Sequence, residues 1–398
     1  MRGRSDDTSA HRPERHIMAR RGFLTTTALL ACTTLLAACG GSADSGSDRD
    51  KSPQPKRTIE AVAGCENAWT DPADLAPTRK PARCAAGSPA AKPLAQRVKI
   101  TVTAGSLSAE YLGPLRTAIA KGEFAKEGLD VELKQMPATD AITLLAKGQV
   151  DVLYSAPEAG MVNAVKQGFD IKWVAGNYSV APESKTGVWA RVKNGRTGDA
   201  VDLKNARFGT LVGKTSVIMY PIESVLAQHK TKPTEVSFQQ LDGAGVPEAF
   251  KNGGIDAAWL LDPIWKDFEG KPEYTFLGGQ PVGEPLGGML YGQNLLAKNR
   301  DAGVAFLRAL IRTVNTYFAG DYKQNPAFVQ ELATTLGSKP ELLRSVPAQV
   351  VDWEIRGGTT DRVQKMYIEG KVVEAPALPE DKLVDRSLYA EAVGHTGP

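Results

Sequence analysis

The stretch LLAKGQVDVLY at residues 144–154 carries the pattern that decides the fold. Its first half has the spacing of a helix, which Gly148 ends, and a short apolar strand begins at Asp151. A similar pattern, AFKNGGIDAAWLLDP, occupies residues 249–263. Two such units, each inside its own series of strands and helices, predict two lobes.

Strands and helices alternate on both sides of these stretches. Short strands separated by helices of about ten residues predict parallel sheets built from right-handed βαβ units. The predicted strands cover residues 98–103, 129–136, 151–155, 171–175, 207–212, 235–241 and 256–261. The predicted helices cover residues 111–121, 139–147, 157–167, 217–230 and 246–252, followed by 301–317, 326–336, 340–346, 360–369 and 379–393. The expected fold is therefore α/β, with two doubly wound lobes and a helical C-terminal part.

The N-terminal residues have the layout of an export signal. A basic stretch precedes an apolar run at residues 23–38, which is shorter than the roughly 20 apolar residues that cross a bilayer. RRGFL at residues 20–24 resembles a twin-arginine motif, so twin-arginine and general secretory export both stay open. Either Met1 or Met18 is the start of the chain. No other segment approaches the length of a transmembrane helix.

The four cysteines fall into two groups. Cys32 lies in the signal, and Cys39 ends the stretch LAAC, which resembles the lipobox of bacterial lipoproteins. Two or more acyl chains on Cys39 would hold the protein stably on the outer face of the cell membrane. Cys65 and Cys84 remain as an even pair in an oxidising compartment, which predicts a disulfide. An ordinary signal with a chance cysteine, and two free thiols, are the alternatives.

The chain divides into four predicted parts. Residues 1–38 form the signal peptide, and residues 39–97 form a lipidated tether and a cysteine-stapled extension with little regular structure. Lobe I is expected to comprise residues 98–182 and 286–398, and lobe II residues 183–285. A net charge of +3, without a concentrated basic face, argues against nucleic acid as a partner. We expect a monomer.

FAKEGLDVE at residues 124–132 resembles the signature of solute-binding proteins of the nitrate, sulfonate and taurine type, a family that extends to thiamine-pyrimidine-like binders. The two stretches at 144–154 and 249–263 match the same family in order, and the resemblance covers residues 98–390. It implies a periplasmic-binding-protein type II fold with a ligand cleft between the lobes. Two segments near residues 178–188 and 280–289 would cross between them.

The same resemblance implies a function. The protein would capture a small solute outside the cell by closing its cleft, and would deliver that solute to an ABC permease. Neither a metal nor a cofactor is expected. Because strand-to-helix loops converge at the carboxyl ends of the strands, the contacts should lie there. The predicted ligand contacts are Ser106, Ser108, Glu110, Tyr111, Ser155, Glu158, Asn177, Tyr178, Trp189, Lys214, Thr215, Ser216, Trp259 and Asp262.

Several of these residues have a structural alternative. Ser155 can cap a helix that has Pro157 at its first position, and the other serines can do the same. The stretch GKTS at residues 213–216 is either an anion cradle or a helix cap. Trp189 and Trp259 fit the core as well as a ligand platform.

The charges of the predicted site are mixed. Glu110, Glu158 and Asp262 favour a cation or an amine, whereas Lys214 and free helix amides favour sulfonate, phosphate or carboxylate. A zwitterion such as taurine would use both, and the aromatic residues would suit a pyrimidine. The sequence leaves these ligands open.

An enzyme on the same fold is the main rival. The pyrimidine synthases that resemble this family use histidine and a cysteine cluster, whereas His229 and His395, the histidines after the signal, have no cysteine beside them. Neither metal-ligand spacing nor a Gly-x-Ser-x-Gly motif occurs. We therefore predict a binding protein, not an enzyme. An anchored scaffold protein without a ligand is the third alternative.

Overall fold

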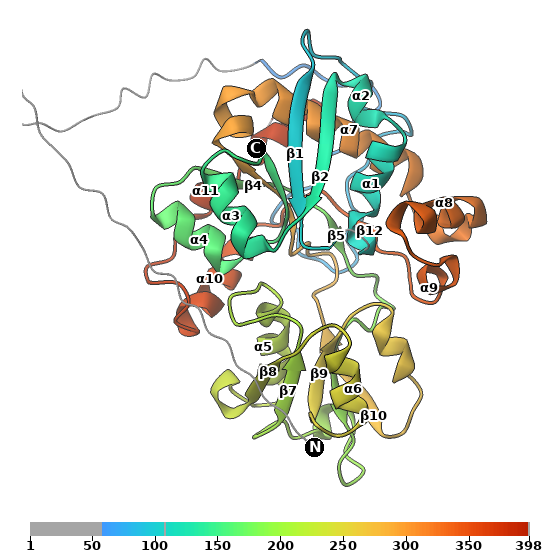
Figure 1. Ribbon diagram of the computed structural model, residues 1–398, viewed down its shortest axis with the longest axis vertical. Coiled ribbons are helices and arrows are strands. Elements are labelled where there is room, and N and C mark those ends of the chain that lie inside the picture. The colour runs from blue at the N-terminus through green and yellow to red at the C-terminus, as the bar shows by residue number, and fades with distance from the viewer. Residues whose placement is uncertain (1–57, 107–108, 397–398) are drawn as a thin grey trace, which may run out of the picture. The chain divides into compact units, whose positions relative to one another are not determined.

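The computed structural model describes residues 58–106 and 109–396 (Figure 1). The predicted signal peptide, the lipidation site at Cys39 and the ligand contact Ser108 lie outside the described residues. Within the described part, no helix is both long and apolar enough to cross a membrane.

The first sheet has five strands in the order β2-β1-β3-β11-β4. They are β1 (Val98–Ala104), β2 (Leu129–Gln135), β3 (Val152–Ser155), β4 (Ile171–Gly176) and β11 (Gly288–Gly292). β1 is parallel to both β2 and β3, whereas β11 runs antiparallel to β3 and β4. We call this sheet and the helices that pack on it lobe I.

The second sheet repeats this arrangement, in the order β10-β6-β9-β7-β8. Its strands are β6 (Gly187–Arg191), β7 (Arg207–Thr210), β8 (Ser237–Gln240), β9 (Ala257–Leu260) and β10 (Tyr274–Gly279). β7 is parallel to β8 and β9, and β6 is antiparallel to β9 and β10. In each sheet one antiparallel strand is therefore inserted at the same place. We call this sheet and its helices lobe II.

Helices cover both faces of each sheet (Figure 1). They are α1 (Gly113–Ala120), α2 (Glu123–Lys126), α3 (Ala138–Ala146), α4 (Ala159–Lys166), α5 (Met219–Gln228), α6 (Gly245–Lys251), α7 (Arg300–Tyr317), α8 (Pro326–Leu336), α9 (Pro340–Arg344), α10 (Thr359–Glu369), α11 (Glu380–Leu383) and α12 (Ser387–Val393). The predicted α/β fold with two doubly wound lobes and a helical C-terminal part is confirmed.

The long helix α7 organises the core of lobe I. It packs against α1, α2 and α12, and its Phe306 stacks on Phe124 with ring centroids 4.7 Å apart. Phe306 and Leu310, one helical turn apart, are both buried in the same cluster as the β1 side chains Ile100 and Val102. On the opposite face, Trp173 of β4 is fully buried near α11.

Two segments, residues 177–186 and 280–287, connect the two sheets. The first contains the short strand β5 (Tyr178–Ser179), which pairs with β12 (Val350–Val351) from the C-terminal part. We propose lobe boundaries inside these segments, at residues 182/183 and 285/286.

Several predicted elements end or begin elsewhere. The helix predicted at 379–393 is two helices, because Val384 leaves the helical path to form a bridge with Trp173. The helix predicted from residue 157 begins at Ala159, so Ser155 and Pro157 precede it and Glu158 takes the N-cap position. The predictions of a Ser155 cap and of Pro157 in the first turn were therefore wrong.

The extension contains neither helix nor strand between residues 58 and 97. The predicted disulfide between Cys65 and Cys84 is confirmed. Trp69 stacks between Tyr389 at 4.9 Å and His395 at 4.2 Å, so the extension packs on the C-terminal helices of lobe I.

Candidate functional site

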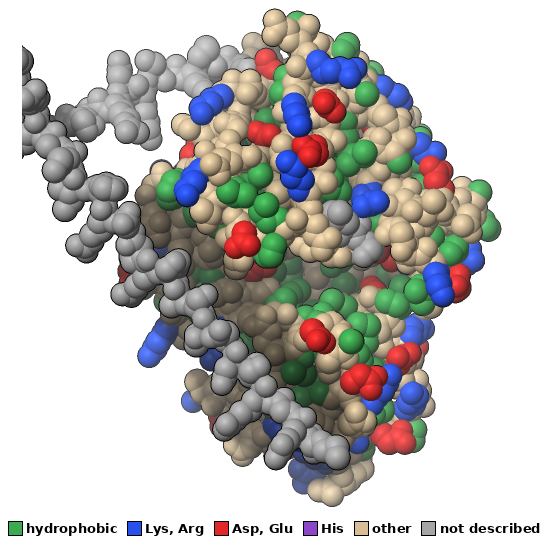
Figure 2. All heavy atoms as spheres, viewed as in Figure 1, with side chains coloured by type: hydrophobic (Ala, Val, Ile, Leu, Met, Phe, Trp, Pro, Cys, Tyr) green, Lys and Arg blue, Asp and Glu red, His purple; other side chains and the backbone are tan. Residues whose placement is uncertain are grey.

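Glu110 of lobe I and Asp262 of lobe II are the two predicted contacts at the centre of the candidate site. Glu110 opens a single 3₁₀ turn after β1, in lobe I, and Asp262 follows the end of β9, in lobe II. Both positions lie at the carboxyl ends of parallel strands, where α/β proteins bind ligands. Figure 2 shows the molecular surface hollowed between the two lobes.

Glu110 is held by two residues of the C-terminal part. Tyr322 donates its hydroxyl proton to Glu110 Oε1 over 2.6 Å, and Lys323 Nζ lies 2.8 Å from the same oxygen. Burial raises the pKa of Glu110, against the lowering effects of Lys323 and Tyr322, and the Asp262 carboxylate adds to the rise. The charge of Asp262 therefore acts on Glu110 although the two residues belong to different lobes.

Asp262 is anchored from its own lobe. Trp265 donates its indole N–H to Asp262 Oδ1 over 2.5 Å. Burial raises the pKa of Asp262, and this hydrogen bond and the nearby Thr186 hydroxyl act in the opposite direction. Thr186 belongs to the first connecting segment, so this segment, together with β9, shapes the surroundings of Asp262.

Tyrosine rings border the two carboxylates on the side of lobe I. Tyr111 stacks with Tyr154 at 6.0 Å and with Tyr178 at 6.3 Å, and in both pairs the rings are nearly parallel. Burial raises the pKa of Tyr178, and the charges of Asp262 and Glu110 raise it further. Two carboxylates and a set of aromatic faces thus share one region of the cleft.

Glu158 has a different role from the one expected. Its carboxylate accepts hydrogen bonds from Ser216 Oγ at 3.3 Å and from the Val217 amide at 3.0 Å. Next to it, the Ala159 amide donates to the Thr215 carbonyl over 3.0 Å. A carboxylate of lobe I therefore binds to Ser216 of the GKTS stretch and to the residue that follows this stretch in lobe II. Burial raises the pKa of Glu158 to about 7.

Some predicted contacts are buried. Trp259 is 2 % exposed in the core, and Trp189 packs behind Trp265 with its indole N–H donating to the Lys185 carbonyl. Asn177 is buried and its side-chain oxygen accepts from the Tyr178 amide.

Other predicted contacts lie nearer the surface. Ser106 and Ser155 are partly exposed at the ends of β1 and β3, and Lys214 and Thr215 are exposed. Ligand contact by any of these residues stays a prediction.

Sequence reasoning missed Tyr322, Lys323, Thr186 and Trp265. The first two lie more than two hundred residues from Glu110 in the chain. A helix-to-helix turn of the C-terminal part carries no local pattern that points to the cleft. Trp265 had a usable signal, because it follows Asp262 by three residues, close enough for a side chain to reach back.

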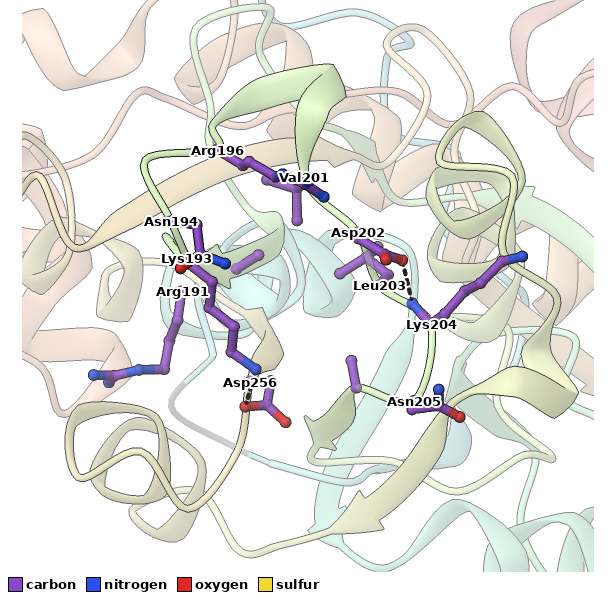
Figure 3. Close-up of a pocket in the computed structure, with 12 residues that line it drawn as sticks. Arg191, Lys193, Asn194, Arg196, Val201, Asp202, Leu203, Lys204, Asn205 and Asp256 are labelled. Carbon is purple, nitrogen blue, oxygen red and sulfur yellow. Dashed lines mark hydrogen bonds and ion pairs between the residues drawn. The ribbon is translucent and has the colours of Figure 1, made fainter.

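A second hollow lies on lobe II, away from these residues (Figure 3). It has a volume of about 230 Å³ and a largely basic lining, which includes Arg191, Lys193 and Arg196. Figure 3 shows Lys193 pointing to Asp256, which accepts from Lys193 Nζ at 2.9 Å. None of the predicted contacts lines this hollow. Among residues 58–106 and 109–396, no group of His, Cys, Asp and Glu side chains could hold a metal ion.

Solved structures share the fold over most of their length. The ligand-binding component of an ABC-type import system from Staphylococcus aureus, solved with zinc bound, is 18% identical, with a TM-score of 0.57 over 75% of this chain and 99% of that one. The alkanesulfonate-binding protein SsuA from Xanthomonas axonopodis pv. citri, bound to MOPS, is 17% identical, with a TM-score of 0.55 over 73% and 99%. A protein from Bordetella bronchiseptica RB50 is 22% identical, with a TM-score of 0.56 over 74% and 97%.

At identities of 17% to 22%, these solved structures show which fold the chain has. No curated protein matches the sequence. The family model described as NMT1/THI5 like matches residues 110–319, which is more than half of the chain and includes Glu110, Asp262 and both connecting segments. The chain belongs to the NMT1/THI5-like family.

Proposed function

We propose that the protein is a solute-binding protein that captures a small molecule between its lobes and delivers it to an ABC permease. The observation that carries the proposal is that Glu110 of lobe I and Asp262 of lobe II both follow the carboxyl ends of parallel strands, with the charge of Asp262 acting on Glu110 and Tyr178. Polar groups that are buried, and that come from two bodies joined by two chain segments, can close around a solute and exclude water from it. The importer relatives with the same fold support this use of the cleft.

Contacts across the lobes would stabilise the closed form. The Glu158 carboxylate on the Val217 amide, and the Ala159 amide on the Thr215 carbonyl, join the start of α4 to the loop before α5. Neither Glu110 nor Asp262 takes part in these bonds. They therefore leave Glu110 and Asp262 for the solute.

An extracytoplasmic location is part of the same proposal. Disulfides persist in oxidising compartments, and the Cys65–Cys84 bond fits such a place. Lipidation of Cys39 would then hold the protein near its permease. Replacing Cys39 with alanine should move the protein from the membrane fraction to the soluble fraction of the producing cell. A variant that stays with the membrane would contradict the lipid anchor.

A thermal-shift screen of the full-length protein in mild detergent tests the binding function. The panel contains taurine, alkylsulfonates, nitrate, bicarbonate, pyrimidines, thiamine and amino acids. Mass spectrometry of each mixture after incubation checks that the compound is unchanged. A concentration-dependent rise in Tm with an unaltered compound supports a binding protein. Conversion of the compound would instead indicate an enzyme. No rise for any compound, with a cooperative melt, would favour a scaffold protein.

A further inference from the structure

Lys323, the cation in contact with Glu110, uses all its N–H donors in hydrogen bonds within the protein. Its ammonium group has three N–H donors. Beyond its bond to Glu110 it donates to the carbonyl oxygens of Leu343 at 2.7 Å and Pro347 at 3.1 Å, and the Val346 carbonyl lies at 3.3 Å. The side chain is 6 % exposed. Lys323 therefore fixes the C-terminal part against Glu110 and is not available to bind an anionic solute.

The other nearby cation is also engaged. Lys266 lowers the pKa of Asp262, but its ammonium group lies 2.8 Å from Glu269 and over the Trp265 ring. The buried ammonium group of Lys323 is thus the cation bonded to Glu110, and Asp262 forms no ion pair with a described residue. This cluster carries more negative than positive charge.

A buried hydroxyl beside Asp262 is incompletely bonded. Thr186 is 7 % exposed, and its Oγ1 makes no hydrogen bond of ordinary geometry with any described residue. Its effect on the pKa of Asp262 places it next to that carboxylate. A hydroxyl group has one donor and two acceptor positions, so the Thr186 hydroxyl keeps bonding capacity for a further partner at the cleft. A hydroxyl and a carboxylate side by side can both accept hydrogen bonds from one donor group.

Two hydrogen-bond donors of the loop before α5, which could bind an anion, are already bonded within the protein. The amide of Val217 and the hydroxyl of Ser216 donate to Glu158 of the protein itself. An anionic solute would have to displace that carboxylate. It would also have to approach Glu110 and Asp262, which repel it.

We propose that the solute presents a protonated nitrogen, as an amine, an amidinium or a protonated aminoheterocycle, to Glu110 and Asp262, with its adjoining surface against the rings of Tyr111 and Tyr178. This inference rests on the proposed function and specifies the class of its substrate. A cation over tyrosine faces gains cation–π attraction, and charge-assisted hydrogen bonds to the two carboxyl groups orient it. An inorganic anion or a simple sulfonate has no such partners here.

The test uses polar metabolites from a cell extract, separated at pH 7 into pools retained by cation exchange, retained by anion exchange, and retained by neither. Each pool is added to the full-length protein in mild detergent, and Tm is measured. Benzamidine, benzamide and benzenesulfonate form a matched set of cationic, neutral and anionic probes. The cation pool should raise Tm, and the compound that co-purifies with the protein should contain a basic nitrogen. A rise confined to the anion pool or to the neutral pool overturns the inference and leaves the binding function standing. No rise with any pool overturns both.

Charge-neutral variants of the same shape locate the effect. Asp262→Asn and Glu110→Gln should each weaken binding of the cationic compound about ten- to a hundredfold, since a hydrogen bond to a charged group is lost. Glu369→Gln, at an exposed carboxylate paired with Lys365, is the control and should bind as the wild type does. Unchanged affinity in both cleft variants, with the compound still bound, would overturn the assignment.

Discussion

Two regions of the molecule bury charged side chains, and they are built differently. The hinge network consists of Arg79, Asp352, Glu354 and Arg356, and the cleft cluster consists of Glu110, Asp262 and Lys323. In the hinge network Arg79 pairs with both carboxylates and donates to the Gly283 carbonyl of the second connecting segment at 3.1 Å. In the cleft cluster acid exceeds base.

The difference between the regions is the balance of charge. Glu354 of the hinge network accepts from the Thr70 amide at 2.6 Å and from the Ala82 amide at 3.1 Å, in addition to its arginine partners. In the cleft, Lys323 is paired with Glu110, whereas Asp262 bonds the Trp265 indole and forms no ion pair with a described residue. Burial of charge alone therefore does not mark a binding site. A buried cluster with unbalanced charge does so more reliably, because a charged solute can balance it.

The largest expected effect is on the hinge network. Arg79→Met leaves Asp352 and Glu354 without this partner in a buried place, and removing one partner of a buried ion pair costs about 3–5 kcal/mol. The free energy of unfolding from denaturant titration measures this. Lys80→Met, at an exposed neighbouring position, is the matched control. Equal stability of the two variants would show that this network does not hold the extension to the second connecting segment.

The disulfide of the extension comes next. Replacing Cys65 and Cys84 with alanine should lower the free energy of unfolding by about 3 kcal/mol, because the unfolded chain regains the entropy of an open loop. Denaturant titration checks this, and mass spectrometry should find a gain of two hydrogens on reduction of the wild type. An unchanged mass would contradict the bond, and unchanged stability would show that other contacts hold the extension.

Much of the fold can be predicted from local sequence patterns, whereas less of the cleft can be predicted from them. The stretch at residues 144–154 predicts α3 and β3, because helix periodicity, a glycine stop and an apolar strand are all local signals. The stretch at 249–263 likewise predicts β9 and places Asp262 at its end. The strands β6 and β10 were not predicted, because pairing with distant partners, not a clear alternation, makes them strands.

Part of the site depends on contacts that no local pattern encodes. Tyr322 and Lys323 reach Glu110 through the return of the C-terminal helices to lobe I. Anion binding by the GKTS stretch stays a prediction, since its Ser216 hydroxyl and the Val217 amide that follows bind a carboxylate of the protein itself. The sequence could not show that this carboxylate is Glu158.

A smaller effect is expected at the contact between the lobes. Because burial raises the pKa of Glu158 to about 7, the folded protein binds this proton more tightly than the unfolded chain does. The resulting stability is present below about pH 4.5 and is lost as the pH rises through about 7. In Glu158→Gln the fall of Tm between these values should be shallower. It should not vanish, since the pKa of Glu223 is also about 7. An identical pH profile in variant and wild type would contradict the account.

The smallest effect on stability is expected in the cleft itself. Asp262→Asn removes a charge whose burial is unfavourable, as the raised pKa of Asp262 indicates, and keeps an oxygen for Trp265. At pH 8 the free energy of unfolding should change by less than about 1 kcal/mol, or rise, as is common when functional residues are replaced. Denaturant titration measures it. A loss as large as that of Arg79→Met would mean that Asp262 serves the fold.

The most direct measurement compares Asp262→Asn with Arg79→Met in one thermal-shift experiment, with and without the cation-exchange pool. Arg79→Met should melt at a lower temperature than the wild type and keep the rise in Tm caused by the pool. Asp262→Asn should melt close to the wild type and lose that rise. If Asp262→Asn kept the full rise, or if the pool stabilised neither the wild type nor Arg79→Met, the cleft between Glu110 and Asp262 would not be the binding site.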